Sequence, residues 1–426
     1  MKKLVINGGR PLKGDITIGG CKNAAVAILP AALLADEPCY IENVPNVADV
    51  RIMIEIMKKL GAECRWESGD SVYVDARHVN SYHADYASLR KMRGSYYFLG
   101  TLLGRFGHAE VAMPGGCDIG ERPIDMHIKG FSSLGAEVKE EYGVVEAHAP
   151  NGLTGASIYL DKVSVGATIN IMLAAAKAAG TTTIENCARE PHVVDVANFL
   201  NSIGAHVRGA GTDVIKIRGV QHLSGSKGYS IIPDQIEAGT YMMAVAATKG
   251  DVTFHNIIPR HMESITAKLE EMGIGVDESE DSIRIYYKGP FHGTTVKTLP
   301  YPGFPTDMQP QITVLLSLAV GQSTVTESVW DNRFRYVSEL RRMGAKIKIE
   351  GGTSAIINGG EELKGTSVKC PDLRAGAALV IAALAADGKS DVYDIKYIDR
   401  GYVDIEKKLA AAGADITRED AELDTV

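Results

Sequence analysis

Two kinds of helical pattern alternate along the chain. Six segments are apolar on nearly every side and rich in alanine, which is typical of helices buried all round. They span residues 24–35, 95–103, 165–179, 236–247, 308–319 and 375–386. The helices of the other kind are amphipathic, as in 51–60, where Glu55, Lys58 and Lys59 lie among isoleucines and methionines. After nearly every buried segment comes a short β-type run, such as 181–186 or 323–327.

Each amphipathic helix ends in an apolar residue followed by glycine. The six glycines are Gly61, Gly135, Gly204, Gly273, Gly344 and Gly413. Successive copies lie about 70 residues apart, and such a near-constant period predicts six copies of one supersecondary unit. Glycine suits the residue just past a helix end, where the backbone turns left-handed. Most copies then continue into alternating residues that predict a strand pair, as in 345–349.

Each unit is therefore predicted to consist of a buried helix, a strand, an outer helix and a strand pair. This arrangement places helices inside and sheets outside, whereas a TIM barrel has its strands inside and its helices outside. The predicted fold class is α/β, a two-domain inside-out α/β barrel with three units per domain. A boundary near 228–232 gives one domain of residues 21–230 and a second of residues 1–20 and 231–426. The leading segment 2–18 is expected to complete the last unit.

Composition and charge narrow the class of protein. The 426 residues are 45% hydrophobic and 23% charged, with a net charge of −8, so a general nucleic-acid or anionic-membrane binder is disfavoured. No apolar run reaches the roughly 20 residues that span a bilayer, and the N-terminus lacks a signal-peptide pattern. We expect a cytoplasmic protein. The six cysteines form no CxxC pair, so neither a zinc site nor a disulfide framework is indicated.

Equivalent positions at the starts of the buried helices carry the first chemical hint. They are Lys22-Asn23, Arg93, Ser164, Gln235, Asp307 and Arg374. These positions repeat with the same period as the glycines. Three of the six carry a cation at the helix end that is already positive, which is unfavourable unless an anion is held there. The sequence therefore predicts an anion site rather than three surface cations.

Arginines also recur at the starts of the outer helices. Positions 13 residues before three of the repeat glycines hold Arg122, Arg260 and Arg400, and Arg333 lies two positions later in its own unit. A single arginine is most often solvated, and we interpret Arg260 in that way. For Arg122 and Arg400 the neighbouring motifs favour a site.

One loop is longer than its counterparts. Residues 114–121 are rich in glycine and contain Cys117, a pattern that predicts a mobile lid with a reactive thiol. A free cysteine is more often a small buried hydrophobe, which suits Cys39 and Cys187 beside their strands. Nearby arginines would favour the thiolate of Cys117, whereas Asp118 and Glu121 would oppose it, so its charge state stays open.

Taken together, these motifs resemble the UDP-N-acetylglucosamine 1-carboxyvinyltransferases, a family of enolpyruvyl transferases. The matching segments are Lys22-Asn23, Pro114-Gly115-Gly116-Cys117, Arg122-Pro123-Ile124-Asp125, 161–168, 304–309, 332–334, 372–374 and 398–402. Their order and length make the resemblance specific, and it covers essentially the whole chain. It implies the family's two-domain inside-out fold and transfer of the enolpyruvyl group of phosphoenolpyruvate to the 3-hydroxyl of the UDP-sugar, with release of phosphate. That reaction belongs to early peptidoglycan synthesis, and so to cell wall biogenesis, cell shape and division.

The resemblance also implies a role for individual residues. Cys117 would donate a proton to the methylene carbon of phosphoenolpyruvate, and Asp307 would accept the proton of the sugar hydroxyl. Lys22, Arg122 and Arg400 would hold phosphoenolpyruvate, with Asn23 near the reacting centre and Arg93 and Arg374 supporting the anionic ligands. The sugar nucleotide would be lined by Arg122, Pro123, Ile124, Asp125, Met126, Lys162, Val163, Ser164, Val165 and Val329. Arg333 is a further expected substrate-binding residue.

No metal or cofactor is expected, and the partners are the two small-molecule substrates, with no nucleic acid, membrane or obligate protein partner implied. The sequence departs from the family at Cys21, Gly94 and Gln235, where Ala, Ala and Arg are usual. Two alternatives stay open: the sister enzyme that acts on shikimate 3-phosphate, which lacks the Cys117 loop, and a non-catalytic sugar-nucleotide sensor, which would have lost Cys117 or Asp307.

Overall fold

All six repeat glycines adopt the left-handed backbone that their position predicts. In a computed structural model of the protein, which describes residues 2–84, 92–113 and 123–421, their φ angles lie between 92° and 104°. At the first of them, the Gly61 N–H donates to the Lys58 carbonyl and the Ala62 N–H to the Met57 carbonyl, both at 3.0 Å. The other five copies close in the same way, so each outer helix ends in a Schellman motif.

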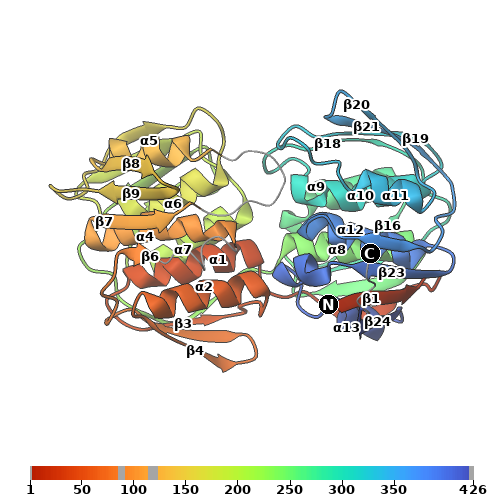
Figure 1. Ribbon diagram of the computed structural model, residues 1–426, viewed down its shortest axis with the longest axis horizontal. Coiled ribbons are helices and arrows are strands. Elements are labelled where there is room, and N and C mark those ends of the chain that lie inside the picture. The colour runs from red at the N-terminus through yellow and green to blue at the C-terminus, as the bar shows by residue number, and fades with distance from the viewer. Residues whose placement is uncertain (1, 85–91, 114–122, 422–426) are drawn as a thin grey trace. The chain divides into compact units, whose positions relative to one another are not determined.

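The chain folds into two units, and it passes from one to the other between Gly19 and Gly20 and between Ile232 and Pro233. The described part of unit 1 is 2–19 and 233–421, and that of unit 2 is 20–84, 92–113 and 123–232. Three four-stranded sheets belong to each unit. The protein therefore has a mixed α/β fold with six small sheets (Figure 1).

Unit 2 contains the first three repeats. Its helices are α1 (Lys22–Ala31), η1 (Ala32–Leu34), α2 (Ala48–Lys59), η2 (Arg93–Tyr96), α4 (Tyr97–Phe106), α5 (Asp125–Ser133), α6 (Val165–Ala175) and α7 (Pro191–Ser202). Its strands are β3 (Cys39–Glu42), β4 (Glu63–Ser68), β5 (Ser71–Asp75), β6 (His83–Ala84), β7 (His108–Ala112), β8 (Glu137–Glu141), β9 (Val144–His148), β10 (Ser157–Tyr159), β11 (Thr181–Glu185), β12 (His206–Arg208), β13 (Val214–Arg218) and β14 (Ser226–Ser230).

Unit 1 contains the last three repeats and the start of the chain. Its helices are α8 (Gln235–Ala247), η3 (Pro259–His261), α9 (Glu263–Glu271), η4 (Thr306–Met308), α10 (Gln309–Leu318), α11 (Val337–Arg342), α12 (Leu373–Ala385), η5 (Ile395–Arg400) and α13 (Ile405–Ala411). Its strands are β1 (Lys2–Asn7), β2 (Lys13–Thr17), β15 (Asp251–His255), β16 (Gly275–Glu278), β17 (Ser282–Tyr286), β18 (Thr295–Lys297), β19 (Gly321–Thr326), β20 (Lys346–Glu350), β21 (Ser354–Gly359), β22 (Ser367–Lys369), β23 (Lys389–Tyr393) and β24 (Asp415–Asp420).

The six sheets share one plan. Each has a short strand paired in parallel with the strand that follows the buried helix, and an antiparallel pair beyond it, as in β10-β11-β13-β12 and β18-β19-β21-β20. The predicted order of buried helix, strand, outer helix and strand pair is confirmed. The sequence analysis missed this parallel strand. In four of the sheets it contains only two or three residues, which give too little alternation to predict a strand.

The start of the chain completes two sheets rather than one. β1 lies between β23 and β24, antiparallel to both, so the chain ends meet in one sheet, where the red and blue ribbons lie side by side in Figure 1. β2 instead pairs in parallel with β15. Segment 2–18 therefore completes the last unit only with its first half, and its second half supplies the short edge strand of the fourth unit.

The buried helices lie where their composition predicts. Nearly every residue of α8, α10 and α12 is buried, and these helices pack against one another in the core of unit 1. In unit 2, residues 97–103 of α4 are buried throughout, and α1 and α6 are buried except at their first one or two residues. The starts of these helices are therefore the places where the chain offers polar groups at the edge of an apolar core.

Candidate active site

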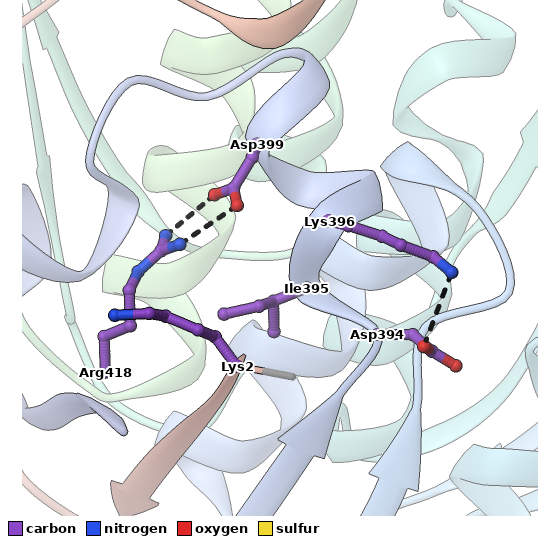
Figure 2. Close-up of a pocket in the computed structure, with 6 residues that line it drawn as sticks. All are labelled: Lys2, Asp394, Ile395, Lys396, Asp399 and Arg418. Atoms are coloured by element: carbon purple, nitrogen blue, oxygen red, sulfur yellow. Dashed lines mark hydrogen bonds and ion pairs between the residues drawn. The ribbon is translucent and has the colours of Figure 1, made fainter. Parts of the chain in front are cut away.

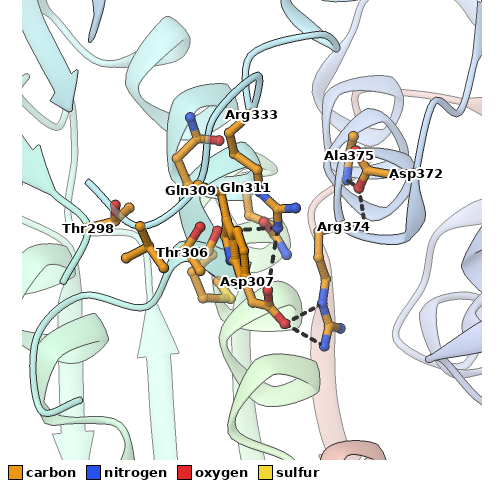
Figure 3. Close-up of polar contacts among 12 residues, drawn as sticks. Thr298, Thr306, Asp307, Gln309, Gln311, Arg333, Asp372, Arg374 and Ala375 are labelled. Atoms are coloured by element: carbon orange, nitrogen blue, oxygen red, sulfur yellow. Dashed lines mark hydrogen bonds and ion pairs between the residues drawn. The ribbon is translucent and has the colours of Figure 1, made fainter. Parts of the chain in front are cut away.

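Asp307 lies at the centre of a charged cluster in unit 1. It belongs to η4, immediately before α10. One carboxylate oxygen, Oδ2, is 3.0 Å from both Nε and Nη2 of Arg374, and the other, Oδ1, is 3.4 Å from Nη2 of Arg333 (Figure 3). The carboxylate is 31% exposed, whereas the two arginine side chains are at most 5% exposed. Two guanidinium groups next to Asp307 stabilise its charged form.

The start of α12 holds Arg374 in place. The Asp372 side chain caps this helix by accepting hydrogen bonds from the Arg374 N–H at 2.9 Å and the Ala375 N–H at 3.0 Å. Burial lowers the pKa of Arg374, but the charge of Asp307 and the neighbouring Tyr402 raise it by more, so that the pKa ends above its ordinary value. Arg374 is therefore charged when it contacts Asp307.

A chain of neutral groups continues behind Arg374. Its Nη1 lies 3.4 Å from the Tyr402 hydroxyl, which lies 2.8 Å from Oγ1 of Thr240. Because Thr240 donates its own proton to the Ile236 carbonyl in α8, at 2.7 Å, the Tyr402 proton points toward Thr240. The Tyr402 oxygen therefore faces Arg374 as an acceptor. Gln311 of α10 donates to Thr240 as well, at 3.1 Å.

Arg400 lies at the last residue of η5, and the adjacent residue fixes that element. Asp399 accepts two hydrogen bonds from Arg418 of β24, at 2.8 and 3.0 Å, and Arg418 also binds Glu406 of α13. A pocket of about 200 Å³ lies at this clamp and is lined by Lys2, Asp394, Ile395, Lys396, Asp399 and Arg418 (Figure 2). None of these residues is a predicted site residue. We therefore interpret the pocket as part of the structural contact that holds η5 through Asp399 and Arg418.

In unit 2, Lys22 stands at the first turn of α1. Its Nζ lies 3.0 Å from Oδ2 of Asp49 in α2, and the side chains are 13% and 2% exposed. The Cys21 side chain provides no cap for the helix. A lysine near an uncapped helix start is the arrangement that the sequence predicts for an anion site. Asn23, the next residue, is partly buried.

Apart from Val329 in unit 1 and Arg122, which is not described, the residues predicted to line the sugar nucleotide fall on two neighbouring segments of unit 2. On the first, Pro123 and Asp125 are exposed, Met126 is partly buried and Ile124 is buried. On the second, Lys162 and Val163 are exposed, Ser164 caps α6 by accepting from the Ala167 N–H at 3.2 Å, and Val165 follows. An ion pair of 2.8 Å between Lys129 and Asp161 joins the two segments.

A neutral network supports these segments from behind. Asn170 of α6 accepts from the Gly100 N–H at 2.7 Å, so its amide nitrogen is the group that donates to the Tyr96 carbonyl at 2.8 Å and to Nδ1 of His127 at 3.0 Å. Burial lowers the pKa of His127 to about 4. His127 is therefore neutral near pH 7, with its proton on Nε2.

Three predicted residues fall wholly or partly outside the described part of the chain. Cys117 and Arg122 lie in 114–122, and of Arg93 only the backbone is described, at the start of η2. The five other cysteines are all buried. Burial raises the pKa of Cys39 and Cys187 to about 11 and that of Cys64 to about 12, and it raises the pKa of Cys370 further. These thiols are therefore poor nucleophiles.

The structure brings Asp307, Arg333 and Arg374 together in unit 1, and Val329 joins the same unit with a side chain that is 37% exposed. Gln235 begins α8 behind the Asp234 cap. The sequence analysis missed Thr240, Tyr402, His127 and Asn170. Tyr402 lies in the recognised motif 398–402. A buried polar residue in an apolar helix was the available indication for Asn170 and Thr240.

Among the residues that the structure describes, no group of three or more His, Cys, Asp or Glu side chains could hold a metal ion. Over the same residues, no helix combines the length and the apolar character that crossing a membrane requires. The described site residues offer cations, the carboxylates of Asp307 and Asp125, and neutral hydrogen-bonding groups, which suits anionic substrates and proton transfer.

Comparisons with known proteins agree with this chemistry. Residues 6–409 match the family model described as EPSP synthase (3-phosphoshikimate 1-carboxyvinyltransferase). The chain is 56% identical over 418 residues to UDP-N-acetylglucosamine 1-carboxyvinyltransferase 3 of Caldanaerobacter subterraneus subsp. tengcongensis, covering 98% of this chain and 99% of that protein. It is 55% identical over 419 residues to UDP-N-acetylglucosamine 1-carboxyvinyltransferase of Clostridium botulinum, covering 98% and 100%.

Solved structures share the fold of this chain at lower sequence identity. The enolpyruvyl transferase NikO from Streptomyces tendae is 26% identical, with a TM-score of 0.89 and 99% of each chain covered. An EPSP synthase from Acinetobacter baumannii is 17% identical, with a TM-score of 0.74 and coverage of 99% and 100%, and shares the fold.

The chain thus belongs to the family of carboxyvinyl transferases that the model describes, which matches all of it but its ends. Within that family it belongs with the UDP-N-acetylglucosamine 1-carboxyvinyltransferases, to which it is closely similar over nearly its full length. The resemblance expected from the sequence motifs is confirmed.

Proposed function

We propose that this chain transfers the enolpyruvyl group of phosphoenolpyruvate to the 3-hydroxyl of UDP-N-acetylglucosamine. A bond forms between the sugar oxygen and C2 of phosphoenolpyruvate, the bond from C2 to the phosphate oxygen breaks, and inorganic phosphate leaves. The observation that carries this proposal is the 56% identity over 98% of the chain to a protein of that name. The Asp307 cluster supports it independently, because it supplies a charged carboxylate beside two cations.

Addition to C2 needs an acid and a base in defined places. We assign the acid to Cys117, which protonates the methylene carbon and builds positive character at C2. We assign the base to Asp307, which accepts the proton of the attacking hydroxyl. Arg374 and Arg333 keep Asp307 charged until that step, and Arg374 then also faces the anionic ligands. On elimination, the methyl group returns its added proton to the protein, the bond from C2 to the phosphate oxygen breaks, and phosphate departs with the proton that was taken from the sugar hydroxyl.

Phosphoenolpyruvate and the UDP-sugar bring several negative charges together, and cations offset their repulsion. Lys22, Arg122 and Arg400 are assigned to phosphoenolpyruvate, with Asn23 near the reacting centre and Arg93 in support. The segments 122–126 and 162–165 are assigned to the uridine and diphosphate, and Val329 to the sugar nucleotide. The exposed side chains of Asp125, Lys162 and Val163 are accessible for that contact.

The finer description of the fold belongs to the same proposal. Buried helices with sheets around them in both units support an inside-out α/β barrel of three repeats per unit. We assign unit 2 to Cys117 and much of the UDP-sugar site, and unit 1 to Asp307, Arg374 and Arg400. A cytoplasmic place at the first committed step of peptidoglycan precursor synthesis follows from the reaction, and with it a role in cell shape and division.

Two experiments test the proposal. Purified protein should release phosphate only when both substrates are present, and the UDP-sugar should gain the mass of an enolpyruvyl group. Shikimate 3-phosphate in place of the UDP-sugar should give no phosphate, which separates the sister activity. A sugar-nucleotide sensor would bind UDP-N-acetylglucosamine and release no phosphate in either case.

The second experiment tests the assignment of the acid. An epoxide shaped like phosphoenolpyruvate should modify Cys117 before any other cysteine, because the described thiols are buried. Cys117→Ser should abolish most turnover and leave sugar-nucleotide binding nearly unchanged. Peptide mapping that finds Cys64 or Cys370 modified first would exclude Cys117 as the reactive thiol.

A further inference from the structure

A recurring side chain follows the first strand of several repeats. Asn43 follows β3, Asn186 follows β11 and Asn256 follows β15, each with a left-handed backbone. Each amide nitrogen donates one hydrogen bond to a main-chain carbonyl just past the short parallel strand of its sheet. The acceptors are Ile231, Leu160 and Ile18, at 2.8, 2.7 and 2.7 Å. In these repeats the position makes one neutral tie between two strand ends.

The fifth repeat places a glutamate at this position. Glu327 follows β19 and is only 3% exposed. Its Oε1 accepts from the Thr298 hydroxyl at 2.7 Å, from the Val329 N–H at 2.8 Å and from the Trp330 N–H at 3.2 Å. Its Oε2 accepts from the Thr306 hydroxyl at 2.9 Å. A buried carboxylate is costly unless it is hydrogen-bonded, and here four donors converge on it.

The segments that Glu327 joins are those that carry the site. Thr306 directly precedes Asp307 in η4, and Val329 is the residue assigned to the sugar nucleotide. Figure 3 shows Thr306 beside Asp307 and Thr298 on the far side of Thr306. A carboxylate presents two acceptor oxygens, so the donors on the Thr306 side and on the Val329 side can all be satisfied at once, whereas an amide would force the Thr306 hydroxyl to accept instead of donate. An asparagine, as in the first, third and fourth repeats, would replace one of these oxygens with a donor.

On these grounds we propose that Glu327 is a positioning residue for the reaction: it fixes the Thr306–Asp307 turn and the Val329 loop relative to each other, so that the base and the sugar-nucleotide contact act on one hydroxyl. This inference rests on the proposed function. Glu327 acts through Asp307 and Val329 and takes no part in proton transfer. A displacement of about 1 Å at a reacting group can cost about 100-fold in rate, so a clamp of this kind controls turnover.

The test compares isosteric variants of the full-length protein. Glu327→Gln keeps the shape but turns one acceptor into a donor. We expect kcat to fall 10- to 100-fold and KM for UDP-N-acetylglucosamine to rise several-fold, with KM for phosphoenolpyruvate within twofold. Asn43→Asp makes the reverse exchange at the equivalent position of the first repeat, against the Ile231 carbonyl. It should lower the melting temperature while kcat and both KM values stay within twofold.

Two threonine variants keep the inference testable if Glu327→Gln does not fold. Thr306→Val removes the donor on Oε2, beside Asp307, and should lower kcat at least fivefold. Thr298→Val removes a donor of the same kind from Oε1 and also the acceptor of the Ser328 N–H at 2.9 Å, so it should cost at least as much thermal stability. It should nevertheless lower kcat less than twofold, because Oε1 keeps the Val329 and Trp330 N–H groups.

The outcomes separate the two claims. Wild-type protein that releases no phosphate with both substrates overturns the proposed function. Wild-type turnover with unchanged kcat and KM in Glu327→Gln, or equal kcat in the two threonine variants, overturns the positioning role and leaves a purely structural one. A loss confined to kcat and the UDP-sugar KM supports it.

Discussion

The two units hold their predicted site residues by different means. In unit 1, Asp307 is fixed by charge, through Arg374 and Arg333, and the neutral Tyr402 stands behind Arg374. In unit 2, the segments assigned to the sugar nucleotide rest on a neutral amide and imidazole, Asn170 and His127. In the proposed reaction Asp307 takes up a proton, so its ion pairs with Arg374 and Arg333 must weaken during turnover. The segments assigned to the sugar nucleotide need only a rigid support whose charge does not change.

The strongest way to break this contrast is to remove the charge of Asp307. Asp307→Asn should lower kcat by about 100- to 10,000-fold, because the amide cannot accept the proton of the sugar hydroxyl. It also leaves the buried Arg374 without its counter-charge, which should cost about 3–5 kcal/mol of stability in unit 1. Steady-state kinetics and thermal unfolding measure the two effects on the same sample.

Asp372→Asn serves as the matched control. It removes a carboxylate charge from the same region, but asparagine caps a helix about as well as aspartate, so α12 and Arg374 should stay in place. Its kcat should remain within a few-fold of wild type. Comparable losses in the two variants would mean that total charge matters rather than the placement of Asp307.

The ion pair in unit 2 provides a second test. Lys22→Met leaves Asp49 buried without its lysine and should cost about 3–5 kcal/mol of stability, besides weakening phosphoenolpyruvate binding. Adding Asp49→Asn should recover much of the stability, because the remaining buried group is neutral. Turnover should stay low in the double variant, since the cation at the start of α1 is still missing. Recovery of turnover together with stability would make Lys22 a structural residue only.

His127 sharpens the comparison through pH. Its pKa is about 4 in the folded protein and 6.5 in an exposed histidine, because it is buried. Between these values the unfolded chain binds a proton that the folded chain does not, so stability falls as pH drops from 6.5 toward 4, by about 3 kcal/mol at the lower limit. Nitrogen NMR of labelled imidazoles should show His127 neutral, with its proton on Nε2, down to about pH 4.

His127→Gln identifies the resonance and should flatten the fall in stability over the same pH range. A His127 signal that titrates near 6.5 would contradict the neutral network, and so would a proton on Nδ1. Either result would remove the contrast between a charged support in unit 1 and a neutral one in unit 2.

The sequence predicted the repeat because its strongest features are local. Six glycines at helix ends and six apolar helices carry their meaning in residue type and spacing, and the structure confirms both. Four of the parallel edge strands could not be predicted because they contain only two or three residues, and the other two, β2 and β14, pair with strands far away in the sequence. Which sheet each half of segment 2–18 joins depends on pairing between distant parts of the chain, as between β2 and β15. A local sequence pattern contains no information about such pairing.

The candidate site divides in the same way. Residues that break a local rule, such as Lys22 and Arg374 at helix starts, were predicted from the sequence alone. Residues whose role depends on a distant partner were not. Glu327 looks like an ordinary strand end until Thr298 and Thr306 lie against it, and Tyr402 gains its direction only from Thr240, 162 residues away.

The smallest effect that still distinguishes the two units is expected at Tyr402. Tyr402→Phe removes the acceptor that faces Arg374 but leaves the pair with Asp307 in place, so Arg374 should lose orientation rather than charge. At 3.4 Å this hydrogen bond is long, so its loss should cost about 0.5–1.5 kcal/mol, which corresponds to roughly 2- to 10-fold in kcat. Tyr229→Phe in unit 2 removes a partly buried hydroxyl that donates to Asp195, at 2.5 Å, and should cost similar stability with kcat within twofold. If both variants lose only stability, the neutral chain behind Arg374 supports the fold alone, and charge by itself holds the base of unit 1.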